Sequence, residues 1–222
     1  MFLKIGADIL PLTMPYTRTG IPLRFIPAGE GNVIHMKNLL TKRTNIILNG
    51  ILGGINGCQD IIKSIEKTGR GDMPVTGIAL ELFPWHGEFG LSLRLSDEFP
   101  MADSRYDSAD WKYFNFTTER EIESIISTKQ FVANLYESEF GEDCSSQDIA
   151  HLLFFSGAMA LIDPKVTSAL REFDIDAPFI GNQFVSSSFE YIVFDGDALI
   201  KSNYCDLVLM DRINKRLMKL IV

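Results

Sequence analysis

The stretch VTGIALELFPWHGEFGLSLRLS, residues 75–96, carries the pattern that decides the fold. Two runs in which apolar residues alternate with others flank a four-residue loop that begins at Pro84 and ends at Gly87. Pairing outward from this loop sets Leu82 opposite Phe89, Leu80 opposite Leu91 and Ile78 opposite Leu93. These side chains then share one face, as an antiparallel hairpin with one buried face requires. The stretch therefore predicts a hairpin over residues 75–95.

The rest of the chain mixes helical and strand patterns without strict alternation. Residues 147–162 are apolar almost all round, which predicts a central buried helix. Another helix is expected from Thr117 or Thr118, where a hydroxyl cap precedes an apolar stripe of Ile122, Ile125, Ile126, Val132, Ala133 and Tyr136. These patterns favour an α+β fold, with a mixed or antiparallel sheet packed against several helices.

Three shorter patterns complete the expected fold. Asp163 and Pro164 supply a cap and a first-turn proline for a short helix. Residues 189–195 are apolar on both faces, which predicts a strand in the interior of the sheet. The tail from Asp206 carries an apolar row at helical spacing, formed by Leu207, Met210, Ile213 and Leu217.

Residues 49–60, NGILGGINGCQD, contain the glycines Gly50, Gly53, Gly54 and Gly57. Neither G-x-G-x-x-G nor a terminal G-K-[ST] is present, so both phosphate-binding motifs are excluded. On a helix the four glycines would share one narrow face. Because each interior glycine costs about 1 kcal/mol relative to alanine, such a helix needs another backbone element packed closely on that face. A loop that precedes a helix near Gln59 is the competing interpretation.

Composition and cysteine usage predict a cytoplasmic globular protein. The one break in composition, at residues 68–74, predicts an N-terminal segment, residues 1–74, docked on a main α+β domain, residues 75–222. No apolar run has the length of a membrane span, and the start lacks a signal-peptide cleavage pattern. The three cysteines are odd in number and scattered, which suits reduced thiols.

The net charge of −8 is unevenly distributed. Residues 1–74 carry nine Lys/Arg against five Asp/Glu, or +4, whereas residues 75–222 carry twelve against twenty-four, or −12. An acidic surface repels nucleic-acid backbones and attracts cationic partners. We therefore expect a cationic protein partner, and neither nucleic acid nor a membrane. A surface that merely keeps the protein soluble is the simpler interpretation.

No motif assigns a catalytic residue, a metal or a cofactor. The histidines, His35, His86 and His151, stand in no metal-ligand spacing, and Ser156 lacks the G-x-S-x-G context of a nucleophile. Trp85 and His86, at the tip of the predicted hairpin, form a candidate loop site, because loops on a rigid scaffold often carry function. Ordinary turn chemistry explains the same residues.

The segment DEFPMADSRYDSADWKYFNF, residues 97–116, interleaves acids with aromatics. Trp and Tyr dominate binding hot spots, and acids around them steer cationic partners. The candidate partner-binding residues are Asp97, Glu98, Asp103, Tyr106, Asp107, Asp110, Trp111 and Tyr113. A polar loop whose aromatic residues anchor it to the core is the alternative.

The succession IALELFPWHGEFGLSLRLS, DSADWKYFNF, ALIDPKVTSALREF and YIVFDGD resembles the small acidic immunity-type proteins that bacteria encode beside polymorphic or contact-dependent toxins. The resemblance covers roughly residues 75–216 and leaves residues 1–74 outside. It implies a cytoplasmic protein that occludes a cognate toxin, often a basic nuclease, and it implies no catalytic residues.

Three functional hypotheses follow from these observations. The first is a non-enzymatic binding protein, an immunity protein that uses residues 97–113 against a cationic toxin. The second is an enzyme, such as a hydrolase, whose acid-base groups come from Glu81, His86, Glu88 and Asp195. The third is a scaffold that self-associates through the face of Gly50, Gly53, Gly54 and Gly57.

Overall fold

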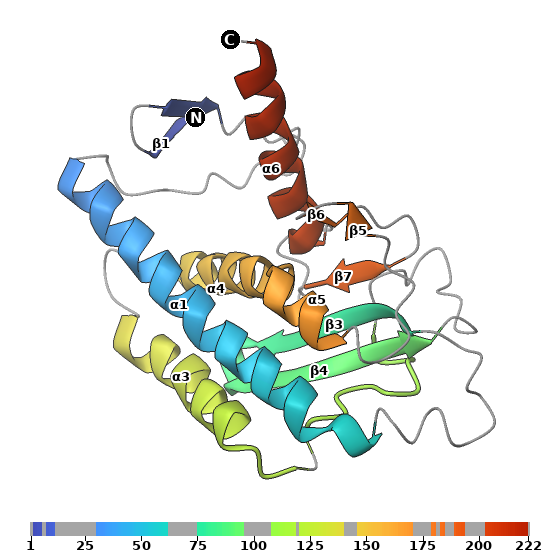
Figure 1. The fold of residues 1–222 in the computed structure, drawn as a ribbon. Helices are drawn as coiled ribbons and strands as arrows, with labels where there is room; N and C mark the ends of the chain where they lie inside the picture. Colours follow the sequence, from blue (N-terminus) through green and yellow to red (C-terminus); the bar gives the residue numbers. More distant parts are fainter. Residues whose placement is uncertain are drawn as a thin grey trace.

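The structure is a computed structural model, and its fold is α+β (Figure 1). It describes residues 2–5, 8–11, 30–61, 75–95, 108–118, 120–139, 146–170, 179–180, 183–184, 189–193 and 203–221. The helices are α1 (Glu30–Gly57), the 3-10 turn η2 (Pro84–His86), α3 (Glu123–Glu139), α4 (Ser146–Leu161), α5 (Pro164–Leu170) and α6 (Tyr204–Ile221). The strands are β1 (Phe2–Ile5), β2 (Asp8–Pro11), β3 (Val75–Phe83), β4 (Glu88–Leu95), β5 (Phe179–Ile180), β6 (Gln183–Phe184) and β7 (Glu190–Ile192).

The central sheet has three strands in the order β4-β3-β7. Strands β3 and β4 form the predicted antiparallel hairpin, and the register is confirmed at Leu82 with Phe89, Leu80 with Leu91 and Ile78 with Leu93. Strand β7 pairs with β3 in parallel, so the sheet is mixed. The turn between β3 and β4 ends at Gly87, whose left-handed φ of 62° favours glycine. Two further antiparallel pairs, β1 with β2 and β5 with β6, lie outside this sheet.

One face of the sheet packs against helices and forms the main core. The apolar row of the hairpin meets α1, α3 and α4. In Figure 1, α1 crosses the sheet, and α3 and α4 lie beside α1. Helix α4 is the buried helix expected over residues 147–162, and Leu153 and Phe154 lie at its centre in this core. Ile47, Ile51 and Ile55 bring α1 into the same core. Helix α1 therefore shares its core with elements that follow residue 75, while the division of the chain at residue 74 stays a prediction.

The glycines lie on α1, so the helical interpretation of residues 49–57 is confirmed. Their face is covered by α3 and β4 of the same chain. A Cβ atom built at Gly53 would lie 2.7 Å from Cβ of Ser124, and one at Gly57 would lie 2.6 Å from a methyl group of Ile122. Gly50 faces Thr128 and Phe89 in the same way. The glycine face is thus in contact with other parts of the same chain, while self-association through it stays a prediction.

Helix α3 begins later than the sequence indicates. The predicted start at Thr117 or Thr118 is wrong, because α3 begins at Glu123. The Thr117 hydroxyl instead accepts a hydrogen bond from the backbone N–H of Leu91, at 3.1 Å, and so fixes the preceding turn to β4. Ile125 and Val132 are buried as expected, whereas Ile126, expected in the stripe, is 43% exposed.

Strand β7 lies at one end of the three-stranded sheet, so its predicted interior place is wrong. It is apolar on both sides because both faces are covered: Tyr191 joins the main core, and Ile192 packs with Ala79 and Trp111 on the other face. Asn203, just before α6, donates from Nδ2 to the carbonyl of Tyr191, at 2.7 Å. Its Oδ1 accepts from the backbone N–H groups of Val193 and Cys205, so it caps α6 and closes the outer edge of β7.

Two further expectations concern helices. The cap at Asp163 is confirmed, since its Oδ1 accepts from the backbone N–H of Lys165 at 2.8 Å. The helical tail is confirmed as α6, which begins at Tyr204. Among the described residues, no single helix has the length and apolar character of a membrane span. Only the bent pair Ile149–Leu161 and Pro164–Leu170, taken together, reaches that length and apolar character.

The close contact at Gly53 predicts that Gly53→Ala destabilises this protein, although the same change would stabilise an isolated helix. Gly53→Ala would stabilise an isolated helix by about 1 kcal/mol, but here the added Cβ collides with Ser124. We expect a loss of about 1–3 kcal/mol in the free energy of unfolding, measured by urea denaturation. Asn56→Ala, at an exposed position of α1, is the control and should be neutral or slightly stabilising. Ser124→Gly should cost less in the Gly53→Ala background than alone; a stabilising Gly53→Ala would contradict the contact.

Candidate functional site

The second face of the hairpin is polar and nevertheless buried. Alternation along the strands places Glu81, Ser92 and Arg94 opposite the apolar row, and they are only 7%, 0% and 6% exposed. Polar groups at this depth require hydrogen-bond partners. For Glu81 and Ser92, one partner each comes from residues 108–118, here called the edge segment, which precedes α3.

The carboxylate of Glu81 joins the sheet to the edge segment. Its Oε1 accepts hydrogen bonds from the hydroxyls of Ser92, at 2.6 Å, and Ser108, at 2.5 Å. The Ser92 Oγ in turn accepts from the backbone N–H of Asn115, at 2.7 Å. Hydrogen bonds to a carboxylate are stronger than those between neutral groups, so this cluster holds two points of the edge segment against the hairpin.

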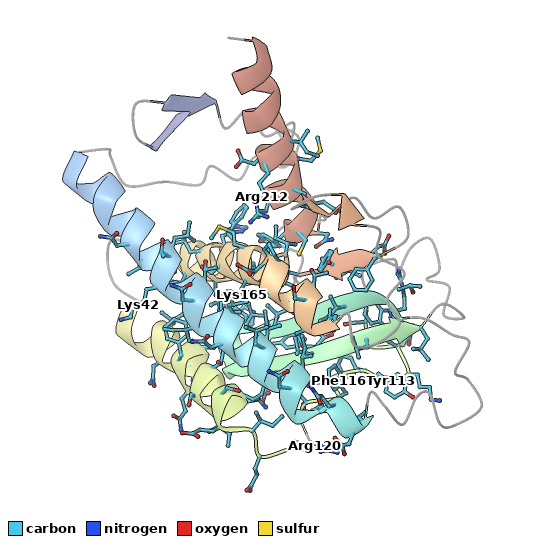
Figure 2. All side chains as sticks on the ribbon, in the orientation of Figure 1. Lys42, Tyr113, Phe116, Arg120, Lys165 and Arg212 are labelled. Carbon is cyan, nitrogen blue, oxygen red and sulfur yellow. The ribbon has the colours of Figure 1, made fainter. Side chains whose placement is uncertain are left out.

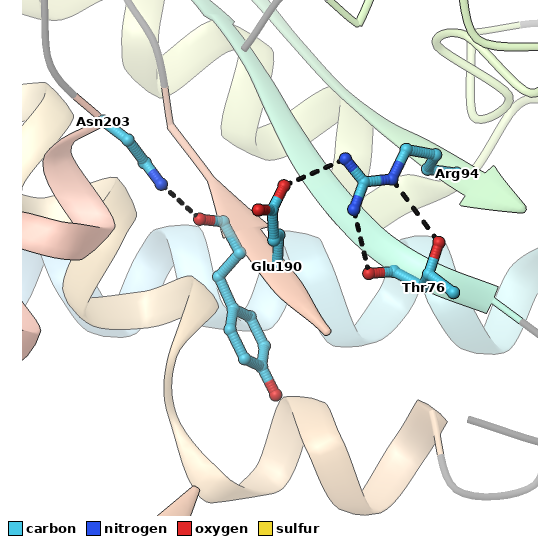
Figure 3. A network of polar contacts seen from close by, with 5 residues as sticks. Thr76, Arg94, Glu190 and Asn203 are labelled. Carbon is cyan, nitrogen blue, oxygen red and sulfur yellow. Dashed lines mark hydrogen bonds and ion pairs between the residues drawn. The ribbon is translucent and has the colours of Figure 1, made fainter. Parts of the chain in front are cut away.

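Arg94 provides a second attachment on the same face. Its Nη1 lies 2.9 Å from Oε2 of Glu190 on β7, and Nε and Nη2 donate to the hydroxyl and carbonyl of Thr76, as Figure 3 shows. The guanidinium carbon lies 5.5 Å from the ring centre of Trp111, within cation–π range. Trp111 itself is 6% exposed and packs on Ala79 and Ile192.

The edge segment also pairs with the outer edge of β4. Tyr113 forms an antiparallel bridge with Leu93, in which the N–H of Leu93 donates to the carbonyl of Tyr113 at 3.1 Å. The N–H of Phe116 donates to the carbonyl of Leu91 at 2.9 Å. Between these bonds Asn115 has a left-handed φ of 43°, which asparagine tolerates better than most residues. Its side-chain amide lies directly over Gly90, where any Cβ would collide with it.

Several side chains of the edge segment face outward from this fixed backbone. Asp110 and Lys112 are exposed, and Phe114 is 42% exposed. Tyr113, labelled with Phe116 in Figure 2, is half-buried, with the Lys112 ammonium 5.5 Å from its ring centre. The segment thus presents acidic, basic and aromatic groups on a backbone that hydrogen bonds and Trp111 hold in place.

The predicted partner-binding residues divide into two groups. Asp110 is exposed on the outer side of the edge segment, whereas Tyr113 is half-buried against the main core and Trp111 is an anchor beneath the segment, as the alternative interpretation expects. The remaining candidates lie outside the described residues: Asp97, Glu98, Asp103, Tyr106 and Asp107. Phe114 is an outward aromatic residue that the prediction missed, although its position within the quoted segment could have suggested it.

Among the described residues, those of the hairpin tip and of the dispersed acid-base set have separate surroundings. His86 is exposed in η2, while Trp85 is half-buried against the main core. Glu88 pairs with Lys129 of α3 at 2.9 Å, whereas Glu81 is enclosed beneath the edge segment. Asp195 lies outside the described residues.

The other residues weighed for chemistry have structural partners. The Nδ1 of His151 lies 2.7 Å from the hydroxyl of Tyr204, and both side chains are buried between α4 and α6. The Ser156 hydroxyl donates to the carbonyl of Leu152 within α4. Within the described residues, no group of three or more His, Cys, Asp or Glu side chains is arranged to hold a metal ion.

Comparison of the chain with protein-family models, with curated proteins and with solved structures finds no match. The function must therefore be inferred from the chain's own residues. The edge segment is the part of the described chain where exposed charged and aromatic groups adjoin a buried polar network. The hairpin register alone places Glu81, Ser92 and Arg94 on one face, but no local pattern reveals that Ser108 and Trp111 cover it.

The hydrogen bonds of Ser92 and Ser108 to Glu81 predict that the edge segment loosens when the Glu81 carboxylate is removed. Glu81→Leu leaves the Ser92 and Ser108 hydroxyls without this acceptor, which should cost about 1–3 kcal/mol of unfolding free energy. In a Trp85→Phe background, Trp111 is the single tryptophan, and its fluorescence should become more accessible to acrylamide. Gln130→Leu alters an exposed side chain in the interior of α3 and should change neither quantity. Unaltered quenching in the Glu81 variant would show that the cluster does not hold the edge segment.

Burial of two thiols and one phenol predicts that the protein becomes less stable at alkaline pH. Desolvation raises the pKa of the Cys58 thiol, of the Cys205 thiol and of the Tyr191 phenol. Below the ordinary thiol pKa of 9.0, each group is protonated both folded and unfolded. Above it, the unfolded chain releases protons that the folded chain retains, so the free energy of unfolding falls as the pH rises.

Urea denaturation in reducing buffer from about pH 8 to about pH 10.5 measures the slope of the free energy of unfolding against pH. Cys205→Ala should make it shallower by up to about 1.4 kcal/mol per pH unit, whatever the variant's starting stability. A slope identical to that of the parent would contradict the assignment to Cys205.

Proposed function

We propose that the protein is a non-enzymatic binding protein, an immunity protein that neutralises a cognate toxin with a basic surface in the bacterial cytoplasm. The observation that carries this proposal is the edge segment, which presents Asp110 and Phe114 outward from a backbone fixed to the sheet. The sequence resemblance to immunity-type proteins supports the same function.

The fixed backbone of the edge segment favours partner binding, because the segment loses less conformational entropy when the complex forms. A loop that orders only in a complex loses conformational freedom at that step, and a preorganised loop avoids this loss. Here Glu81, Arg94 and the bridge at Leu93 fix the segment before any partner arrives. An exposed Phe114 on such a support can act as an aromatic anchor, and half-buried Tyr113 lies beside it.

The charge distribution favours a cationic partner. Residues 75–222 carry twelve Lys/Arg against twenty-four Asp/Glu. Such a field accelerates association with a basic surface and weakens as salt screens it. The acids from Asp97 to Asp107 precede the edge segment in sequence and belong to the proposed partner-binding set, although they lie outside the described residues.

Affinity capture from the native host tests for the partner. The immobilised chain is expected to retain one basic protein at low salt and to release it as the ionic strength rises. Mass spectrometry then identifies the retained protein. A retained partner that is acidic, or whose release does not depend on salt, would contradict the proposed electrostatic surface.

Substitutions then test the surface against the purified partner. Asp107→Lys combined with Asp110→Lys should slow association by about tenfold or more at low salt and flatten its salt dependence. Phe114→Ala should instead accelerate dissociation, with a cost of about 2 kcal/mol if Phe114 is an anchor. Asp206→Lys combined with Asp211→Lys reverses two exposed acids on α6, is the charge-matched control and should have little effect. Unchanged kinetics in both edge-segment variants would exclude this surface.

A further inference from the structure

The edge segment contains one residue more than regular pairing with β4 allows. Tyr113 pairs with Leu93, so an unbroken antiparallel ladder would set Asn115 opposite Leu91. Instead, the N–H of Phe116 donates to the carbonyl of Leu91, at 2.9 Å. Three residue steps along the edge segment therefore match two along β4, which is the arrangement of a β-bulge.

Asn115 is the extra residue, and its backbone has the conformation that such a bulge needs. Its φ is 43°, the single positive value among the non-glycine residues in the described part of the chain. Its N–H donates to the Ser92 hydroxyl, at 2.7 Å, and its carbonyl accepts from the N–H of Thr118, at 3.0 Å. Asparagine tolerates the left-handed region, and a left-handed residue at the first position is typical of one class of bulge.

The bulge decides which way the neighbouring side chains face. Tyr113 and Phe116 both pack on the main core. Side chains three residues apart lie on opposite faces of a regular strand, so the extra residue is what lets both reach the same core. Between them, the Asn115 amide lies over Gly90 on the polar face of the hairpin, and Phe114 is 42% exposed.

We propose that Asn115 is a positioning residue, which sets the direction of Phe114 through the bulge and thereby shapes the contact with the basic partner. This inference rests on the proposed function, in which Phe114 is the aromatic anchor. Residues held in sparsely populated backbone conformations cluster at functional sites. Glycine would form the same bulge with less strain, but it would lack the amide that holds the bulge against Gly90.

Gly90 is the second part of this positioning device. A Cβ at position 90 would lie 2.7 Å from the amide carbon of Asn115, so the glycine leaves the space that the amide fills. A bulge that serves only to bring Phe116 into the core is the alternative. Under that alternative, substitutions of Asn115 change the stability of the protein without changing what Phe114 contributes to binding.

A double-mutant cycle with the purified partner separates the two roles. A β-branched residue strongly disfavours the left-handed region, whereas glycine adopts it freely. We expect Asn115→Val to raise the dissociation constant by about tenfold and Asn115→Gly to raise it by less than about threefold. In the Phe114→Ala background, Asn115→Val should have little further effect, because Asn115 acts through Phe114. An equal effect of Asn115→Val in both backgrounds overturns the proposal.

A rescue experiment tests the contact between the amide and Gly90. Gly90→Ala should weaken binding by about tenfold, and Asn115→Gly in the same chain should restore it to within about threefold, because the colliding amide is gone. Gly77→Ala on β3 is the matched control, since its Cβ would lie no closer than 3.4 Å to the nearest listed neighbours, and it should leave binding unchanged. Failure of Asn115→Gly to restore binding overturns the role assigned to the amide.

Fluorine NMR of the chain labelled with 4-fluorophenylalanine measures the position of Phe114 without a partner. Its resonance is assigned from its absence in Phe114→Leu, and that of buried Phe154 from Phe154→Leu. We expect Asn115→Val to shift the Phe114 resonance and Asn115→Gly to leave it near its parental position, while the Phe154 resonance changes in neither.

The spectrum and the binding data distinguish a failure of the positioning from a failure of the proposed function. An unshifted Phe114 resonance in Asn115→Val overturns the positioning, whatever the binding result. A shifted resonance, combined with a partner that Phe114→Ala binds as tightly as the parent does, instead overturns Phe114 as the anchor of the proposed surface.

Discussion

The close approach of α1 to α3 and β4 at the glycine face is the constraint on which much of this structure depends. Side chains at Gly50, Gly53 or Gly57 would collide with Thr128, Ser124 or Ile122. Their absence lets both helices lie together on the apolar face of the hairpin, and the buried isoleucines of α1 complete the core beside them. The intrinsic helix cost of glycine is thereby offset by packing that no larger residue would permit.

Placement of α3 has a consequence for the opposite side of the sheet. Because the edge segment leads directly into α3, fixing that helix fixes where the segment leaves β4. The segment then folds over the polar face, where Ser108 reaches Glu81 and Trp111 reaches Arg94. One stretch of chain thus closes the outer edge of β4, covers a buried carboxylate and displays Asp110 and Phe114.

The proposed binding surface depends on how the edge segment is fixed to the sheet. The edge segment combines charge with an aromatic side chain on a fixed backbone, which suits rapid encounter with a basic partner.

The sequence by itself determined the elements whose signals are local. Alternation fixed the β3–β4 register, the all-round apolar run predicted α4, and glycine spacing indicated a helix with a close neighbour. Tertiary structure decided the rest: that Thr117 ties a turn to Leu91 instead of starting a helix, that β7 ends the sheet, and that Trp111 anchors the edge segment. The physical reason is that periodicity reports whether a side chain is buried, whereas the identity of its neighbour depends on contacts between residues distant in sequence.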